Sequence, residues 1–272
     1  MTSTPPTKIH IRAAIAAVVA LLGLAVAGAA DASAATCFGK QPTIVRGPGN
    51  DRVQGTNGND VIFTGKGNDT VAAGDGKDLV CSGNGNDTVD SGNDDDKLDG
   101  GEGNDELHGY NDADKIVGGD GKDFLDGRRG EIGDNLIGGA GDDRLLGGEK
   151  LSGGDGDDRL DGDGYKNDSS SDRISGGDGD DEITGDFGGN AGDRIDAGPG
   201  DDDVRGADED DTIRGGDGAD EIDAGSGDDD LFGEADDDVL EGGAGSDAID
   251  GGPGTDTCAD SDAMTTLNAC EV

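Results

Sequence analysis

The sequence is poor in large apolar side chains: its 272 residues include no tryptophan, and aromatic residues make up 3%. It is also poor in positive charge, with 20 basic residues against 64 acidic ones. This composition excludes a conventional globular core and, taken alone, is typical of a disordered chain. The net charge of −44 excludes nucleic acid as a partner, because phosphates would be repelled, and it favours cations.

Catalytic motifs are missing as well. The sequence contains neither the H-E-x-x-H pattern of zinc proteases nor the G-x-S-x-G pattern of serine hydrolases. A zinc site is disfavoured, because there is no C-x-x-C pair and histidine occurs only as His10 and His108. The spacing of an EF-hand calcium loop is absent too. We therefore predict that the protein is not an enzyme.

One apolar run, residues 13 to 30, follows the basic residues Lys8 and Arg12 and precedes the small residues 32 to 34. This order predicts a helical secretory signal peptide over residues 1 to 34, and hence export to the extracellular space. The alternative is an uncleaved membrane anchor, since 18 apolar residues lie at the lower limit of spanning length.

From residue 46 to residue 259 a nine-residue unit of the form G-G-x-G-x-D-x-U-x recurs, where U is aliphatic. Residues 118 to 126 and residues 215 to 223 are clean copies. The segment divides into 23 units, of which 19 have nine residues. U is aliphatic in all but the last unit, where it is Cys258, and Asp stands at the sixth position in all but the unit of residues 147 to 152. A disordered tail has no reason to keep such a period, so the pattern predicts a solenoid of stacked repeats.

Each position of the unit has a mechanical reason. The three residues x-U-x form a short strand that directs U to one face, and Val, Ile and Leu suit a buried parallel strand. Glycine at the first, second and fourth positions permits a sharp turn and leaves room for backbone carbonyls to face a metal. These carbonyls and the Asp carboxylate are the hard oxygen ligands that Ca²⁺ takes. One buried aliphatic side chain contributes roughly 1.5–3 kcal/mol. That does not offset the entropy of ordering nine residues, so we expect the chain to need calcium in order to fold.

The tandem G-G-x-G-x-D-x-U-x units resemble the RTX, or hemolysin-type, calcium-binding repeat family of secreted bacterial proteins. The resemblance implies an all-β fold: a parallel β-roll, which is a right-handed β-solenoid with two repeats in each coil, two facing sheets and Ca²⁺ between adjacent turns. About one ion for each Asp-bearing turn amounts to roughly 20 ions, which nearly cancels the net charge of −44.

By the same resemblance, the side-chain ligands of calcium are the sixth-position aspartates Asp51, Asp60, Asp69, Asp78, Asp87, Asp96, Asp105, Asp114, Asp123, Asp143, Asp158, Asp181, Asp202, Asp211, Asp220, Asp229, Asp238, Asp247 and Asp256.

Some units depart from the pattern. Asp94, Asp112, Glu209 and Asp236 stand where the third glycine belongs, which predicts strained turns or weaker metal binding there. Between residues 127 and 196 three units are lengthened and one is shortened, so we expect protruding loops and the weakest part of the calcium ladder. The loops could form a recognition face, but tolerated drift on a surface loop is the simpler interpretation.

The four cysteines lie in two pairs near the ends of the repeats, Cys37 with Cys81 and Cys258 with Cys270. Local disulfides would staple both ends of the solenoid, whereas disulfides between opposite ends would have to span the whole stack. Three connectivities are possible in principle, and four free thiols are the alternative.

Four segments follow: a signal peptide over residues 1 to 34, a lead-in cap over 35 to 45, the calcium-binding roll over 46 to 259, and a C-terminal cap over 260 to 272. We predict a secreted, non-catalytic protein that becomes a rigid β-roll on binding many extracellular calcium ions, without a membrane span after signal cleavage. The alternative is a calcium-dependent adhesin that presents a repetitive face to a cell-surface or matrix partner. A surface-layer component or an ice-binding module belongs to the same alternative class, and the outward positions carry no ordered threonine array that would favour ice or surface binding.

Overall fold

The computed structural model describes residues 36–127, 133–162, 171–186, 191–260 and 266–270. These residues form strands and turns, and they include no helix that could cross a membrane. The predicted signal peptide, residues 1–34, lies outside the described residues.

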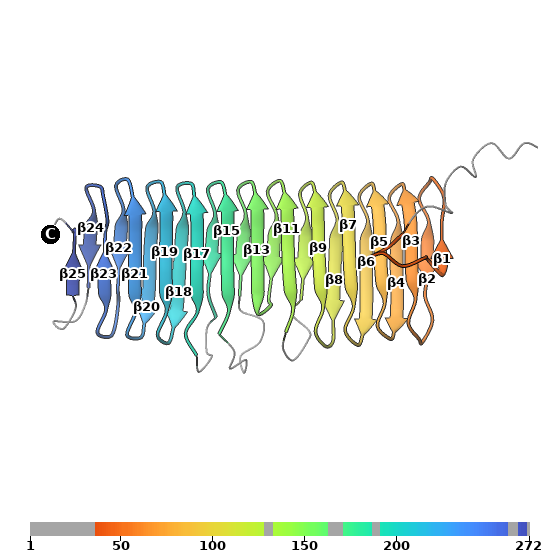
Figure 1. The fold of residues 1–272 in the computed structure, drawn as a ribbon, viewed down its shortest axis with the longest axis horizontal. Coiled ribbons are helices and arrows are strands. Elements are labelled where there is room, and N and C mark those ends of the chain that lie inside the picture. Colours follow the sequence, from red (N-terminus) through yellow and green to blue (C-terminus); the bar gives the residue numbers. More distant parts are fainter. Residues whose placement is uncertain (1–35, 128–132, 163–170, 187–190, 261–265, 271–272) are drawn as a thin grey trace, which may run out of the picture.

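The strands form two parallel sheets that lie face to face along an elongated roll (Figure 1). The 13-stranded sheet contains, in spatial order, β1 (Ile44–Val45), β3 (Val61–Lys66), β5 (Leu79–Asn84), β7 (Lys97–Glu102), β9 (Lys115–Asp120), β11 (Asn135–Ala140), β13 (Lys150–Asp155), β15 (Arg173–Asp178), β17 (Arg194–Pro199), β19 (Thr212–Asp217), β21 (Asp230–Ala235), β23 (Ala248–Asp250) and β25 (Thr266–Asn268). The 12-stranded sheet contains β2 (Arg52–Gln54), β4 (Thr70–Asp75), β6 (Thr88–Asn93), β8 (Glu106–Tyr110), β10 (Phe124–Asp126), β12 (Arg144–Leu146), β14 (Arg159–Asp161), β16 (Glu182–Thr184), β18 (Asp203–Asp208), β20 (Glu221–Ser226), β22 (Val239–Glu241) and β24 (Thr257–Ala259). Consecutive strands alternate between the two sheets. Each strand therefore pairs with the strand two places further along the chain, as β3 does with β5. The predicted all-β parallel solenoid is confirmed.

The repeat pattern creates the core. The aliphatic residue at the eighth position points between the sheets, and each lies beside its counterpart in the next coil, as Ile62 beside Val80 and Val71 beside Val89. The aliphatic residues of this row are at most 3% exposed, and Cys258 ends the row at 6%. The seventh and ninth positions face outward, because neighbouring side chains of a strand point to opposite faces. The core is therefore a double row of aliphatic side chains, one from each sheet.

Glycine at the second and fourth positions satisfies two separate demands of the turns. Gly101 and Gly103 have φ values of 110° and 128°, which disfavour a side chain. A Cβ on either residue would also collide with the carbonyl group of the matching glycine in the preceding coil, Gly83 or Gly85. Successive coils consequently stack in direct backbone contact.

The four residues that replace the fourth-position glycine adopt the same left-handed backbone. The φ values are 76° at Asp94, 71° at Asp112, 77° at Glu209 and 82° at Asp236. Stacking therefore imposes the turn conformation even where the residue opposes it, and each side chain costs stability relative to glycine. Three second-position residues that the sequence analysis did not single out also have positive φ: Tyr110, Ala207 and Glu234.

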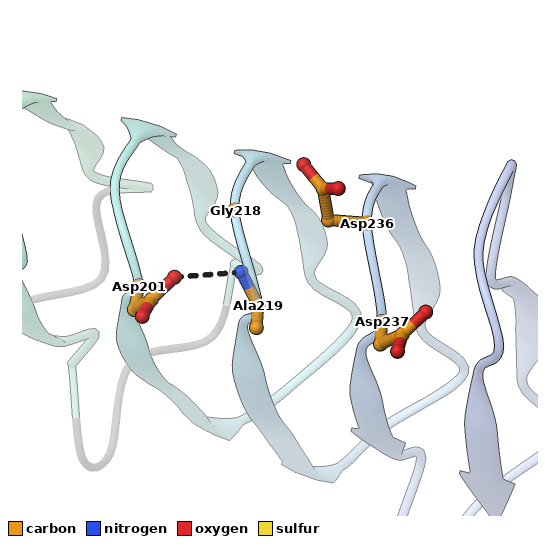
Figure 2. A pocket seen from close by; sticks show the side chains of 5 residues that line it. All are labelled: Asp201, Gly218, Ala219, Asp236 and Asp237. Atoms are coloured by element: carbon orange, nitrogen blue, oxygen red, sulfur yellow. Dashed lines mark hydrogen bonds between the residues drawn. The ribbon is translucent and has the colours of Figure 1, made fainter.

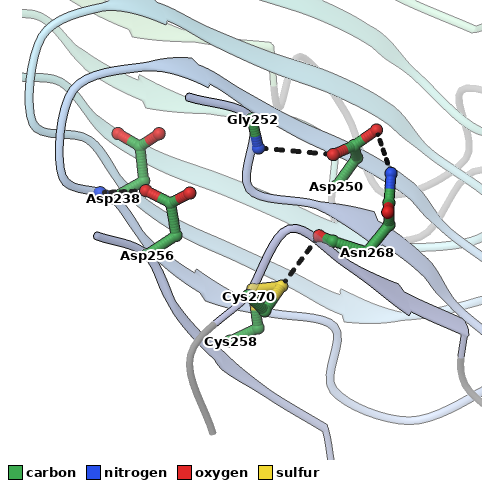
Figure 3. The surroundings of a disulfide bond; sticks show 7 residues. All are labelled: Asp238, Asp250, Gly252, Asp256, Cys258, Asn268 and Cys270. Carbon is green, nitrogen blue, oxygen red and sulfur yellow. Dashed lines mark hydrogen bonds between the residues drawn. A yellow bond between two sulfur atoms is a disulfide. The ribbon is translucent and has the colours of Figure 1, made fainter. Parts of the chain in front are cut away.

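Both ends of the roll carry a disulfide. Cys37 is bonded to Cys81 with a Cα–Cα distance of 5.7 Å, and Cys258 to Cys270 with a Cα–Cα distance of 5.6 Å. The predicted local pairing is confirmed, and none of the described cysteines is free. At the C-terminal end, Asn268 of β25 also donates a 2.8 Å hydrogen bond to an aspartate of β23 (Figure 3).

The two edges of the roll differ. At one edge the chain passes from the 13-stranded to the 12-stranded sheet, and every repeat that turns there has nine residues; we call this the regular edge. At the other, the irregular edge, it passes back to the 13-stranded sheet. All the lengthened and shortened repeats turn at the irregular edge, in the connections β10–β11, β12–β13, β14–β15 and β16–β17. The departures predicted for residues 127 to 196 are thus confined to one edge.

Glu209→Gly is expected to stabilise the calcium-saturated roll. Relief of the positive φ at this position raises the free energy of unfolding by about 1 kcal/mol. Glu221→Gly removes the same charge from a strand and is expected to lower the free energy of unfolding by roughly 0.5–1 kcal/mol. Thermal unfolding followed by circular dichroism compares the two variants, and effects of the same sign would contradict the imposed turn conformation.

Candidate metal centre

The sixth-position aspartates form a hydrogen-bonded ladder along each edge, which we call the inner ladder. On the regular edge, the backbone N–H of each aspartate donates to Oδ1 of the corresponding aspartate in the next coil, at 2.7 to 3.1 Å. This ladder runs without a break through Asp51, Asp69, Asp87, Asp105, Asp123, Asp143, Asp158, Asp181, Asp202, Asp220, Asp238 and Asp256. One carboxylate oxygen of each residue after Asp51 is thereby committed to stacking the coils.

The second carboxylate oxygen is buried without a hydrogen-bond partner. On the regular edge this holds for Oδ2 of every ladder aspartate from Asp69 to Asp256. These residues are at most 3% exposed. A buried carboxylate oxygen without a partner is costly. A continuous row of such atoms is therefore the chemistry expected of cation ligands.

Backbone oxygens face the same space as Oδ2. At Gly118, a Cβ would lie 2.7 Å from the carbonyl oxygen of Gly138 in the next coil and would collide with Oδ2 of Asp123. The same arrangement recurs one coil later at Gly138, where the neighbours are Asp143 and the carbonyl of Gly153. The first position is glycine here because the carboxylate folds back over its Cα atom. Carboxylate and carbonyl oxygens together are a ligand set that suits Ca²⁺.

Side chains alone do not complete such a site. Within the described residues, no group of three or more His, Cys, Asp or Glu side chains is placed to hold a metal ion. An ion at the ladder would therefore need further oxygen ligands, from backbone carbonyls of the turns or from water.

The inner ladder of the irregular edge is interrupted. One block links Asp60, Asp78, Asp96, Asp114 and Asp134, and a second block links Asp172, Asp193, Asp211, Asp229 and Asp247. Between the blocks lies the shortened repeat, in which the carbonyl of Glu149 accepts a 3.0 Å hydrogen bond from the N–H of Arg173.

All nineteen aspartates predicted from the sequence lie in the two inner ladders. The inner ladder of the irregular edge also contains Asp134, Asp172 and Asp193, sixth-position aspartates of the lengthened repeats that are not among the nineteen. Their lengthened turns still deliver the carboxylate to the ladder position, since each is followed by the strand that carries the buried aliphatic residue.

An outer ladder, which the sequence analysis missed, lies on the outer side of the turns. The fifth position is Asn or Asp in most repeats, and its Oδ1 accepts a hydrogen bond from the backbone N–H of the same position in the next coil. Asp201 accepts from Ala219 in this way at 2.9 Å, and both line a hollow with Gly218, Asp236 and Asp237 (Figure 2). The bias of the fifth position towards Asn and Asp was the signal that could have revealed this ladder.

Burial raises the pKa of several inner-ladder carboxyl groups, among them Asp87, Asp105 and Asp114. Desolvation is the largest cause and neighbouring aspartates add to it, while the hydrogen bond from the preceding coil opposes it. The pKa rises from the ordinary 3.8 to about 6 for Asp87, about 7 for Asp105 and about 8 for Asp114. Such a group stays ionised at neutral pH when a bound cation compensates its charge.

The fold and its edges thus define a parallel β-solenoid with rows of buried acidic oxygens. The family model described as RTX calcium-binding nonapeptide repeat (4 copies) matches residues 46–80, 82–107, 99–131, 132–149, 150–164, 168–191, 187–222, 196–231 and 223–258. The chain belongs to this family of calcium-binding repeat proteins.

Other comparisons add little to this assignment. No curated protein sequence matches the chain significantly. Among solved structures, the chain is similar to a hyperactive, Ca²⁺-dependent, β-helical antifreeze protein from an Antarctic bacterium, with 18% identity and a TM-score of 0.43 over 80% of this chain and 83% of that one.

In metal-free buffer, acid is expected to favour the roll and neutral pH to abolish it. Folded-state pKa values of about 6 to about 8 lie above the ordinary 3.8, so the folded chain binds more protons in this window. Its stability is therefore greatest below about pH 4 and is lost as pH rises through these raised pKa values. Far-UV circular dichroism across this range measures the strand content. Loss of strand content by the metal-free chain on acidification would contradict the raised pKa values of the inner-ladder carboxyl groups.

Proposed function

We propose that the protein is a secreted, non-catalytic calcium-binding protein that folds into a right-handed β-roll, with two nonapeptides per coil, when many extracellular calcium ions bind. The observation that carries the proposal is the unbroken row of buried Oδ2 atoms without hydrogen-bond partners along the regular edge. The 18-residue offset between paired residues such as Ile62 and Val80 supports two repeats per coil.

The sixth-position aspartates, together with turn carbonyls, would hold the ions. Oδ2 of Asp123 and the carbonyl of Gly138 belong to adjacent coils and approach the same point, so an ion there would join the two coils. When bound, calcium supplies the positive charge that the buried carboxylates need. Ca²⁺ suits this flexible all-oxygen set better than Mg²⁺, which demands tighter octahedral geometry and gives up its waters reluctantly.

Repulsion between the stacked carboxylates is the reason why the fold would need bound metal. Adjacent coils lie about 4.8 Å apart, so like-charged carboxylates of one ladder repel one another along its whole length. Neutralisation by roughly one divalent ion per turn removes this repulsion and nearly cancels the net charge of −44.

An extracellular site of action fits the covalent structure. The two disulfides indicate an oxidising compartment. Extracellular calcium modules bind at about 10⁻⁴ to 10⁻³ M, so the chain would stay unfolded at low cytoplasmic calcium and fold after export.

Calcium removal is expected to unfold the protein. At neutral pH, excess EDTA should abolish the strand signal in far-UV circular dichroism, and added Ca²⁺ should restore it, because metal binding and folding are coupled. Magnesium at the same concentration serves as the control ion and should not restore the signal. Full strand content in EDTA would overturn the proposed function.

Asp158→Asn is expected to weaken calcium binding, whereas Asp157→Asn is not. Asp158 lies in the inner ladder with Oδ2 buried, and Asp157 is its exposed neighbour in the outer ladder. Both substitutions keep an Oδ1 acceptor and remove one charge, so the comparison isolates the buried ligand. Calorimetry should find about one or two fewer bound ions for Asp158→Asn. An equal loss of bound ions in the two variants would show that the inner-ladder carboxylates are not the metal ligands.

A further inference from the structure

A row of basic side chains crosses the middle of the 13-stranded sheet. The row follows the outward seventh position of six neighbouring strands of that sheet, β7 to β17, which Figure 1 places in the centre of the roll; five of these positions are basic, and β11 carries Asn135. Register aligns its members rung by rung, and we call them the basic strip: Lys97, Lys115, Asn135, Lys150, Arg173 and Arg194. All six are exposed or half-buried.

The basic strip has no anionic partner in the described part of the chain. Its five cations form no ion pair there, and neither do Arg52 and Arg144 on the 12-stranded sheet, whereas Arg159, Arg205 and Arg214 each bind a carboxylate. The strip concentrates five of the chain's 20 basic residues although the net charge is −44. Like charges on adjacent strands, about 4.8 Å apart, destabilise a sheet. Because the aligned cations destabilise the sheet and pair with no carboxylate of the described residues, the basic strip points to an anionic ligand from outside the chain.

A smooth shelf lies beside the strip. The outward ninth-position residues of β9 to β15 are small or aliphatic: Val117, Ile137, Ser152 and Ser175. Beyond them, the second position is glycine on all four strands, with positive φ: Gly119, Gly139, Gly154 and Gly177. At the two ends, Asp99 and Asp196 occupy the ninth position and delimit this neutral area.

We propose that the basic strip and its shelf bind a linear anionic polysaccharide that lies along the axis of the roll. The cations meet carboxylate or sulfate groups repeated along the polymer. The hydroxyls of Ser152 and Ser175 suit sugar hydroxyls, and Val117, Ile137 and the glycines accept the flat faces of sugar rings. No aromatic side chain stands at these shelf positions, so single-stranded nucleic acid finds no stacking platform.

Calcium loading and polysaccharide binding are coupled in this proposal. The metal-free chain repels any polyanion, whereas the calcium-loaded roll is close to neutral and leaves the basic strip as a local positive surface. The inference goes beyond the proposed calcium function and requires its folded state. Circular dichroism in calcium, measured first on every variant, separates failure to fold from failure to bind.

The test measures binding of the calcium-loaded full chain to immobilised heparin, a linear sulfated polysaccharide, with neutral dextran as the control polymer. The triple variant Lys115→Gln, Lys150→Gln and Arg173→Gln should lose binding. The matched control is Arg52→Gln, Arg144→Gln and Arg159→Gln, which removes three charges from the same strand position on the 12-stranded sheet. This control should retain binding, and added salt should weaken binding of the unmodified chain.

Several outcomes would overturn the inference. Absence of heparin binding by the folded, unmodified chain would do so directly. Equal losses in the two triple variants would show a general charge effect. Tighter binding to a DNA duplex than to heparin would assign the strip to nucleic acid. Calcium-dependent self-association that the strip variant abolishes would assign it to a second copy of the chain.

Discussion

The structure depends on one interaction, the hydrogen bond from the backbone N–H of a sixth-position aspartate to the carboxylate of the next coil. This bond fixes the spacing of the coils and commits Oδ1, as between Asp143 and Asp158. It also leaves Oδ2 buried in a row of like charges, a state that the protein alone does not stabilise. The other features serve this stacking. Glycines allow backbone contact between coils, and a thin aliphatic core adds too little burial to hold the coils without a cation. Under the proposed function, metal binding and folding are therefore coupled.

The two edges of the roll differ in the continuity of their inner ladders. The regular edge carries an unbroken inner ladder from Asp51 to Asp256, so it can hold every coil in register by itself. Variation in repeat length has accumulated at the opposite edge, where the ladder is split around the shortened repeat. A turn that changes length there does not shift the strands, because each strand remains paired to the coil before it, as β15 does to β13. One continuous inner ladder thus permits variation in repeat length along the other edge.

The distribution of charge follows the same geometry. Inner-ladder carboxylates belong to the turns, where an ion would neutralise them. The outward positions of the strands do not face that site. The basic strip occupies such positions, on strands that border the interrupted part of the irregular edge. In the proposed calcium-loaded state, the otherwise acidic solenoid would present a positive row on the 13-stranded sheet. A roll with a row of aligned cations is a suitable scaffold for a partner with its own linear repeat.

The sequence by itself determined the repeat, the aliphatic core row and the nineteen sixth-position aspartates, and it favoured the local pairing of Cys37 with Cys81 and Cys258 with Cys270. It could do so because each coil contacts only its neighbours, so a sequence period translates directly into a stack. Only the tertiary structure decided which repeats share an edge. Ladder partners are 18 residues apart in regular coils but 15 for Asp143 with Asp158 and 23 for Asp158 with Asp181. Sequence spacing therefore does not reveal that the turns of unusual length all lie on the irregular edge. It also does not reveal that Asp134, Asp172 and Asp193 belong to the inner ladder, or that the five cations of the basic strip are aligned. The physical reason is that strand pairing sets these neighbours, and the turns between the strands absorb the differences in length.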